Sequence, residues 1–577
     1  MLGHLSAIYG KEIASKTLTR LREILGTACR VTGGRVRNVC ERLDEKSAVL
    51  ITYGDQVSDE GVSPLRTLTE LLSDTVGGAV SHVHVLPFFP YSSDDGFSVI
   101  DYEEVDGKLG SWGDIRRLAE RFGLMADLVL NHISAESPWF KSFLAGGIPY
   151  QDFFVTMPEG LDLSRVVRPR TSPLLTRFHT AAGERSVWTT FSEDQVDLNY
   201  ANPEVLLRMV EILLRYVAQG ITMVRLDAVA FLWKEAGTSC IHLPQTHRII
   251  QLFRSVLDAV APDVLLVSET NVPHTENVTY FGSGGNEAQL VYQFPLPPLV
   301  LSAFQQRDAT PLSCWLRSID EPPGNCVFFN FLASHDGIGL RPAEGILGQA
   351  QEEALVQQTV AHGGRVSYRT NADGSAVPYE LNISYFDALS DPAGESPHDL
   401  QVSRFLTAHA MMLCLAGVPG IYFHSLFGSR SWCAGVELLG TNRAINREKL
   451  KRPDLVKALD DPRSLRHRVF DGFRHLLRAR GSSRAFRPRS RQEILTIDPR
   501  IFAVRRWDPE SSECVCCLHN VTQETVSIHV GLKEAGFAEA ACLLDLLGSR
   551  TYSVDGEDWL SIRLSSFQSV WLTTEIV

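Results

Sequence analysis

Short apolar runs alternate with helical patterns along most of the chain, and this alternation is typical of parallel β/α units. Five segments carry apolar positions at the spacing of an amphipathic helix: residues 65–72, 114–122, 203–218, 247–260 and 406–415. Eight runs have the length and composition of buried strands: AVLITYGD, HVHVLPFF, LMADLVLNH, ITMVRLDAV, DVLLVSETN, LVYQF, CVFFNFLASHD and GIYFHSL. Eight strand–helix units close into a barrel, so we predict an α/β fold of the (β/α)8 TIM-barrel type.

Two connections are too long to be simple crossovers between strands. Residues 133–202 are rich in aromatic residues, prolines and polar turns, whereas residues 337–391 are rich in Gly, Asn and Arg. Loops of this length in a compact domain are usually functional. Both leave the carboxyl ends of strands, where barrel enzymes place their active sites. We therefore expect two inserted loop domains, insert B (133–202) and a second insert (337–391), within a catalytic barrel of residues 47–485.

The two ends of the chain depart from the barrel pattern. Residues 1–46 carry an amphipathic pattern, LTRLREIL, ahead of the first strand, which predicts an N-terminal helical extension. Residues 486–577 turn to short alternating runs such as IFAVRRW and TVSIHV, which are typical of a small antiparallel β-domain. We expect both segments to support the barrel rather than to take part in chemistry.

Composition and charge narrow the classes of partner. The 577 residues carry a net charge of −13, which argues against nucleic acid or an anionic membrane surface as a general partner. The apolar run 405–423 is interrupted by His409, two glycines and Pro419, so a buried helix, a turn and a strand explain it better than a membrane span. The start of the chain lacks an export signal, and the 11 cysteines form no disulfide or zinc framework. We therefore expect a cytoplasmic protein without a membrane partner.

The segment GITMVRLDAVAF ends a predicted strand on two charged residues, Arg225 and Asp227. Burying such groups costs several kcal/mol unless they are paired or used. A single polar residue at a strand end is more often a cap or a loop hydrogen-bond partner, but several on one rim favour an active site. The other polar residues at predicted strand ends are Asp94, Asp95, Asp127, Asn131, His132, Glu269, His335 and Asp336.

Carboxylates at the ends of successive strands suit glycosyl transfer with retention of configuration. Retaining enzymes need an ionised carboxylate to attack the anomeric carbon and a second carboxyl, roughly 5–5.5 Å away, to act as acid and then base. Asp227 and Glu269 fit these two roles. Arg225, two residues before Asp227, would keep that aspartate ionised by lowering its pKa.

Four segments resemble the signature regions of the α-amylase superfamily of retaining α-glucoside enzymes: ADLVLNH, GITMVRLDAV, LLVSETN and FLASHD. The resemblance covers nearly the whole barrel. It implies that Asp227 is the nucleophile, Glu269 the acid/base and Asp336 the transition-state stabiliser. It also implies that the glucosyl unit is held by Arg225, His132 and His335. Ser334 stands where many members have Asn, which concerns the subgroup and not the chemistry.

Within that superfamily the chain resembles the sucrose phosphorylase branch. The runs LPFFPYSSDDGFSVIDYEEVD, EDQVDLNYANP, RLDAVAFLWKEAGTSC and LAGVPGIYF are similar to sequences of that branch. By this similarity Asp94 binds glucose at O4 and O6 with Arg447 as its companion, and Phe191 and Gln195 line the pocket. Such enzymes release α-glucose 1-phosphate, so the implied partners are a small sugar and inorganic phosphate.

The second insert carries the basic candidates for phosphate. Arg365, Arg369 and Tyr379 could supply a phosphate-binding loop, and a solvated basic loop is the other interpretation. The stretch IHLPQTH, the N-terminal extension and this insert resemble the branch that acts on 2-O-α-glucosylglycerate, the glucosylglycerate phosphorylases. A glycerate carboxylate suits an arginine fork from Arg365 or Arg369. His242 and Gln245 could also contact the acceptor, although a helix start is an equal interpretation.

Several alternatives stay open. A sucrose or sucrose 6-phosphate phosphorylase or an α-glucosidase-type hydrolase would keep the same three carboxylates. A non-catalytic amylase-fold scaffold would not need them intact. Asn131 occupies a position used for calcium in many amylases, but the branch generally works without the ion, so we expect no metal and no cofactor. The sequence leaves the acceptor, the direction of the reaction and a homodimer undetermined.

Overall fold

The structure is a computed structural model, and it describes residues 1–32, 43–158, 160–370, 375–394, 396–537, 540–554 and 559–574. Parts of the sequence-based expectations lie outside the described residues. These parts are residues 33–42 of the N-terminal extension, 159 of insert B, 371–374 of the second insert, 395 of the barrel and three short stretches of the C-terminal segment, 538–539, 555–558 and 575–577.

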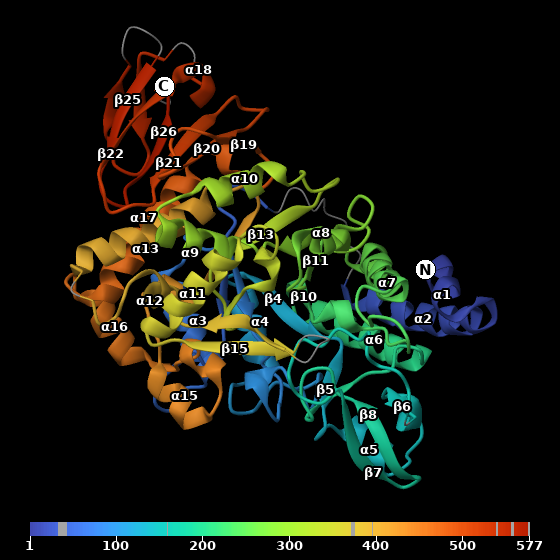
Figure 1. The fold of residues 1–577 in the computed structure, drawn as a ribbon. Coiled ribbons are helices and arrows are strands. Elements are labelled where there is room, and N and C mark those ends of the chain that lie inside the picture. Colours follow the sequence, from blue (N-terminus) through green and yellow to red (C-terminus); the bar gives the residue numbers. More distant parts are fainter. Residues whose placement is uncertain are drawn as a thin grey trace.

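Eight parallel strands close into a barrel at the centre of the molecule (Figure 1). They follow one another around the barrel in chain order, and the last pairs with the first. They are β1 (Val49–Thr52), β3 (His82–Val85), β4 (Gly123–Val129), β10 (Ile221–Asp227), β11 (Leu265–Ser268), β12 (Leu290–Tyr292), β13 (Val327–Phe331) and β17 (Val418–Tyr422). Each coincides with one of the predicted runs, so the predicted (β/α)8 fold is confirmed.

The strands are mostly apolar because both of their faces are covered, and their few charged residues, such as Arg225 and Asp227 of β10, are buried as well. Every residue of β1, β11, β13 and β17 is buried. Helices form the outer layer, and the predicted helical patterns fall on α3 (Pro64–Thr75), α4 (Trp112–Ala119), α6 (Pro203–Ala218), α7 (Pro244–Val260) and α13 (His398–Leu413).

Local sequence sets the start of these helices. In α6, Pro203 occupies the first turn, and the Asn202 side chain accepts the Glu204 N–H at 3.0 Å. The long apolar run at 405–423 forms the end of α13 and then β17. Within the described residues, no helix has the length and apolar character that crossing a bilayer requires.

The two long inserts form small sheets of their own at the carboxyl end of the barrel. In insert B, β5 (His132–Ser134) pairs with β9 (Gln195–Asp197), and a second sheet contains β6 (Thr156–Met157), β8 (Gly183–Trp188) and β7 (Leu175–Thr180). In the second insert, β14 (Ile338–Gly339), β16 (Ala376–Asn382) and β15 (Arg365–Thr370) form a sheet beside α11 (Gln349–Ala361).

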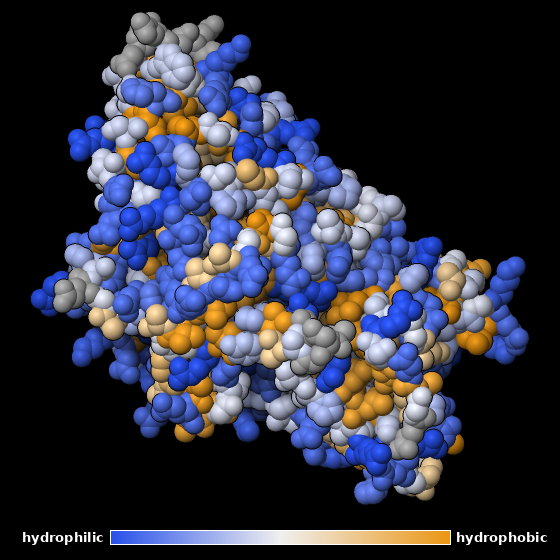
Figure 2. Space-filling view, viewed as in Figure 1, coloured by the Kyte–Doolittle hydropathy of each residue, from blue (hydrophilic) through white to orange (hydrophobic). Residues whose placement is uncertain are grey.

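Insert B also has a small apolar cluster of its own, which includes Val155, Val166 and Trp188. Figure 2 shows hydrophobic side chains gathered on the surface over this part of the molecule, while hydrophilic residues cover most of the remaining face.

The segments at the two ends of the chain pack against the barrel. Helices α1 (Leu2–Tyr9) and α2 (Lys11–Thr32) contact α7 and α6, and the Tyr9 hydroxyl donates to the Tyr200 carbonyl at 2.9 Å. The C-terminal segment forms an antiparallel sheet of β19 (Arg491–Leu495), β20 (Ile501–Trp507), β21 (Cys514–Asn520), β26 (Ser569–Thr573), β23 (Cys542–Asp545) and β24 (Thr551–Ser553). The buried Arg506 of β20 donates to the Cys414 carbonyl at 2.7 Å, which ties this sheet to the end of α13.

Candidate active site

A cavity of about 740 Å³, part of it open to solvent, lies at the carboxyl ends of the barrel strands. Its walls come from the strand ends, from insert B and from the second insert. Ten residues singled out in the sequence line it: Asp94, His132, Phe191, Gln195, Arg225, Asp227, Glu269, His335, Asp336 and Tyr379. The fold therefore brings together side chains that are far apart in the chain, from Asp94 to Tyr379.

The buried Arg225 and Asp227 at the end of β10 are paired with each other and with neighbouring charged side chains. Arg225 Nη1 donates to Asp227 Oδ1 at 2.9 Å and also pairs with Asp127 of β4. Asp127 in turn contacts His84 Nε2 at 2.7 Å. Burial alone would raise the pKa of Asp127, but His84 and Arg225 bring it down to about 2. The guanidinium is thus fixed by a permanent anion on one side, which aims it at Asp227.

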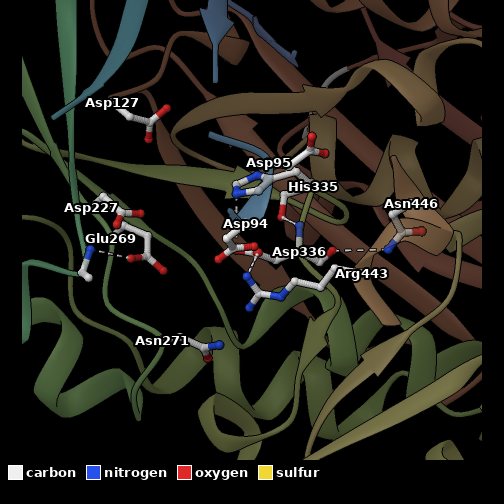
Figure 3. A network of polar contacts seen from close by, with 12 residues as sticks. Asp94, Asp95, Asp127, Asp227, Glu269, Asn271, His335, Asp336, Arg443 and Asn446 are labelled. Atoms are coloured by element: carbon white, nitrogen blue, oxygen red, sulfur yellow. Dashed lines mark hydrogen bonds and ion pairs between the residues drawn. The ribbon is translucent and has the colours of Figure 1, made fainter. Parts of the chain in front are cut away.

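Glu269, directly after β11, lies beside Asp227 (Figure 3). Its Oε2 accepts the Ala228 N–H at 3.0 Å and is 3.9 Å from Arg225 Nη2. Burial raises the pKa of both Asp227 and Glu269, and Arg225 opposes this rise. The prediction that Arg225 lowers the pKa of Asp227 is therefore wrong in its net effect, because burial outweighs the arginine. Arg225 is nevertheless 2.9 Å from Asp227 and 3.9 Å from Glu269, and on this difference we assign a proton retained by the pair to Glu269. One carboxylate is then ionised while its neighbour is an acid.

Asp336 is surrounded by cations. The side chain of Arg443 points toward it (Figure 3), with Nη1 2.5 Å from Asp336 Oδ1. Arg447 Nη2 is 3.7 Å from the same oxygen. Arg443 is held from behind by the buried Glu380, with contacts of 3.1 and 2.7 Å. Burial would raise the pKa of Asp336, but Arg443, His335 and Arg447 hold it well below its usual range. Asp336 is therefore ionised at neutral pH.

Asp94 lies in a strained turn at the rim of the cavity. In the 3₁₀ helix η2 (Asp94–Gly96), Asp94 and Asp95 adopt φ values of 50° and 53°. Gly96 has φ 113°, and a Cβ there would lie 2.7 Å from the Pro87 carbonyl oxygen, so glycine is required. Arg447 Nη1 lies 3.4 Å from Asp94 Oδ1. Such strain persists where the surroundings fix a side chain for function.

The two histidines of the cavity are neutral. His132 Nε2 contacts the Phe97 carbonyl at 3.0 Å and lies 3.2 Å from Gln195 Nε2. The His335 ring stacks on Phe97 with centroids 4.8 Å apart. Burial lowers the pKa of His132, and it lowers that of His335 to about 3. Both rings can therefore hydrogen-bond sugar hydroxyls without adding charge near Asp227.

Most candidates for phosphate or for the acceptor lie outside the cavity wall. Arg365 donates to the carbonyls of Gly363 and Gly364, and Arg369 pairs with Glu344 at 2.8 Å. His242 and Gln245 lie at the start of α7, behind the wall. Of this group only Tyr379 lines the cavity, while Arg447 reaches it through Asp94.

Three arginines line the cavity that did not stand out in the sequence: Arg170, Arg341 and Arg443. Arg443 lies four residues before Arg447, and Arg341 lies five residues after Asp336, so both are close in sequence to residues with an implied role. Arg170 had no such signal, because it lies within insert B. Its guanidinium lies 5.8 Å above the Tyr379 ring, and no carboxylate in the described part of the chain pairs with it.

An ammonium group fills the position beside Asn131. Lys234 Nζ is 2.6 Å from Asn131 Oδ1, from Asp197 Oδ2 and from the Phe231 carbonyl oxygen. Three oxygen acceptors match the three donors of an ammonium, whereas calcium takes six to eight oxygens. These three oxygen atoms therefore fit the lysine ammonium better than a calcium ion. The expectation of a metal-free enzyme remains a prediction.

Replacing Lys234 by methionine should lower the free energy of unfolding by about 3–5 kcal/mol, because it leaves the buried Asp197 uncompensated. Denaturant unfolding measures the change. Lys141→Met is the control, since its exposed pair with Glu136 should contribute less than about 1 kcal/mol. Equal small losses in both variants would contradict a structural role for Lys234.

The chain is similar in sequence to the α-amylase catalytic domain and to glucosylglycerate phosphorylases. The sequence model of the α-amylase catalytic domain matches residues 74–337. The chain is 49% identical over 578 residues to the glucosylglycerate phosphorylase of Spirochaeta thermophila, covering 99% of this chain and 97% of that protein. It is 52% identical over 524 residues to the glucosylglycerate phosphorylase of Allomeiothermus silvanus, covering 90% and 92%.

Among solved structures, the crystal structure of sucrose 6F-phosphate phosphorylase from Thermoanaerobacter thermosaccharolyticum is similar, with a TM-score of 0.72 and 23% identity. The match covers 90% of this chain and 98% of that chain. At this level of identity the similarity concerns the fold.

Proposed function

Since this chain belongs to the α-amylase family, in the group of the glucosylglycerate phosphorylases, we propose that it transfers a glucosyl unit from 2-O-α-D-glucosylglycerate to phosphate. It is an enzyme of the phosphorylase type, a hexosyltransferase. The products of the proposed reaction are α-D-glucose 1-phosphate and D-glycerate.

One geometric observation supports this proposal above the others. Asp227, Glu269 and Asp336 face one cavity, and the same cavity contains Arg170, which forms no close ion pair with a carboxylate of the described residues although its charge lowers the pKa of Asp94. Three carboxylates suit glucosyl transfer, whereas a guanidinium with donors left for a ligand suits an anionic partner such as phosphate. A hydrolase would need only the carboxylates, because its acceptor is water.

In the first step of the proposed mechanism, Asp227 attacks the anomeric carbon of the bound glucoside. The bond from C1 to the glycerate oxygen breaks, and Glu269 gives its proton to that oxygen. Arg225 keeps Asp227 ionised beforehand, and the ionised Asp336 favours the positive charge that develops on the ring. The result is a glucosyl ester on Asp227 and free glycerate.

In the second step, a phosphate oxygen attacks C1 from the side that glycerate has left. The ester bond to Asp227 breaks, a proton of the phosphate passes to Glu269 and restores its acid form, and two inversions give net retention of the α configuration. Glycerate and phosphate use the same place in succession, and both are anions. A single basic acceptor site therefore serves both halves of the reaction, which suits the arginines on this side of the cavity.

Replacing Arg170 by glutamine should raise the KM for phosphate about 10- to 100-fold, since a charge-assisted hydrogen bond contributes about 1.5–3 kcal/mol. Initial rates of phosphorolysis against phosphate concentration measure it. Arg369→Gln is the comparison, because Arg369 is the phosphate candidate taken from the sequence and pairs with Glu344 outside the cavity. A larger effect at Arg369 would favour the sequence-based assignment.

Acceptor identity is tested by running the reaction in reverse. With α-glucose 1-phosphate as donor, phosphate release is followed for D-glycerate, glycerol, fructose and fructose 6-phosphate. We expect D-glycerate to be the best acceptor. If fructose or its phosphate is active while glycerate is inert, the enzyme is a sucrose-type phosphorylase and the proposed substrate is wrong.

A further inference from the structure

Arg341 lies on the acid/base side of the cavity. It begins the 3₁₀ helix η6 (Arg341–Ala343), two residues after Gly339 of β14. A Cβ on Gly339 would lie 2.7 Å from Asn271 Oδ1, so this segment packs directly against the loop that carries Glu269. Asn271 and Arg341 line the same cavity. In the proposed mechanism the acceptor oxygen exchanges its proton with Glu269, so Arg341 lies on the acceptor side.

The guanidinium of Arg341 retains donors for a ligand. Its side chain is 17% exposed, and its carboxylate contact is a single distance of 3.7 Å, from Nη2 to Glu276 Oε2. Charge-assisted hydrogen bonds are close to 2.7–2.9 Å, so this pair orients the arginine without saturating it. Within the described residues Glu276 is the one carboxylate paired with Arg341.

Glu276 is itself held by a strained segment of the chain. His242 Nε2 lies 3.1 Å from Glu276 Oε2, and His242 Nδ1 lies 2.7 Å from the Tyr280 hydroxyl. His242 and Cys240 adopt positive φ values of 57° and 52°, which non-glycine residues rarely take. Strain of this kind persists where the structure fixes a functional group.

A neutral His242 imidazole can make both of its contacts, to Glu276 and to Tyr280. Burial lowers the pKa of His242, which favours the neutral ring. With the proton on Nε2, His242 donates to Glu276, and Nδ1 accepts the hydroxyl hydrogen of Tyr280. The segment IHLPQTH therefore reaches the cavity indirectly, through Glu276 and then Arg341.

We propose that Arg341, positioned by Glu276 and His242, binds the carboxylate of the acceptor and so restricts acceptors to 2-hydroxycarboxylic acids. This inference rests on the proposed function and names the residue that selects its acceptor. A neutral acceptor would leave the remaining donors of this half-buried arginine unpaired, and sites built for a polar group reject analogues that lack it.

A competition between D-glycerate and glycerol tests Arg341 alone. Both acceptors react with one common glucosyl-enzyme formed from α-glucose 1-phosphate. In each case the hydroxyl oxygen bonds to C1 as the Asp227 ester breaks, and the hydroxyl proton passes to Glu269. The product ratio therefore reports acceptor recognition and is independent of donor binding.

The wild-type protein should favour glucosylglycerate. Arg341→Gln should lower the product ratio about 10- to 100-fold, as expected for a lost charge-assisted hydrogen bond. Arg341→Lys, which keeps the charge without the fork, should fall in between. Glu276→Gln should lower the ratio less than Arg341→Gln does, because the arginine remains but loses its anchor.

Arg452→Gln is the matched control and should leave the ratio unchanged. Arg452 is also partly buried and ion-paired, with Glu70 at 2.9 Å, but it is not part of the cavity wall. An unchanged ratio in Arg341→Gln overturns this inference alone. A wild-type protein that glucosylates neither acceptor, or prefers glycerol, overturns the proposed function as well. If Arg341→Gln does not fold, the ratios of Arg341→Lys and Glu276→Gln decide.

Discussion

Replacing Asp227 by asparagine should lower turnover by at least roughly 10⁴-fold, with α-glucose 1-phosphate still bound. An amide cannot attack the anomeric carbon, so no glucosyl-enzyme forms. Arg225 keeps its pair with Asp127 in this variant, and Asp94 and Arg447 are untouched, so the fold and the sugar pocket should survive. Steady-state phosphorolysis gives the loss of turnover, and calorimetry gives the affinity for the donor.

Asp114→Asn is the control for a general effect of the substitution. Asp114 caps α4 on the outside of the barrel, so this variant should keep wild-type turnover. Turnover of Asp227→Asn within about tenfold of the wild-type value would remove Asp227 from the nucleophile position. Such a result would also revive the interpretation of the chain as a scaffold that does not need this carboxylate.

Replacing Glu269 by glutamine should slow reactions with glycerate much more than reactions with phosphate. Glycerate leaves as an alkoxide unless it is protonated, so its transfer should fall by roughly 10²–10⁴-fold, the usual contribution of a general acid or base. Phosphate is a good leaving group and an anionic nucleophile, so it needs little help from Glu269. Exchange of labelled phosphate with α-glucose 1-phosphate should therefore fall far less in the same variant.

The pH dependence gives a second measurement on Glu269. Burial raises the pKa of this carboxyl above its ordinary value. Because glucosylation by glucosylglycerate needs the protonated form, the rate should hold to higher pH than for an ordinary glutamic acid, and then fall as pH rises through the raised pKa. Glu269→Gln should lose this alkaline limb. Equal losses of glycerate transfer and phosphate exchange would contradict the assignment of Glu269 as acid/base.

The barrel and the three carboxylates could be predicted because each depends on a short stretch of sequence. A buried strand needs a continuous apolar run, and its carboxyl end is marked by the first polar residue. Asp227 and Glu269 lie at or directly after the ends of neighbouring strands, β10 and β11. Parallel strands bring such ends to one rim whatever the connections between them are.

The acceptor side was harder to predict because it is built by the inserts. Arg170 and Tyr379 come from different inserts, yet the arginine lies 5.8 Å above the tyrosine ring. That closeness depends on how two small sheets pack, and no local pattern encodes it. The basic residues of β15 are phosphate candidates by their charge alone, but in the structure Arg365 donates to carbonyls of the preceding turn and Arg369 pairs with Glu344.

The segment around His242 illustrates an intermediate case. Its sequence allows two interpretations for His242 and Gln245, which are direct contact with the acceptor and the start of a helix. With positive φ values at Cys240 and His242, the imidazole contacts Glu276 instead. His242 therefore acts on the cavity only through Glu276 and Arg341. Backbone strain at residues other than glycine is a property that a single sequence does not reveal.

The most direct test of the proposed function is the product formed from 2-O-α-D-glucosylglycerate with and without phosphate. Nuclear magnetic resonance distinguishes α-glucose 1-phosphate, its β anomer and free glucose in one spectrum. We predict that the α anomer and D-glycerate form in equal amounts and only when phosphate is present. Free glucose as the main product, formation of the β anomer, or no reaction with this substrate would contradict the proposal.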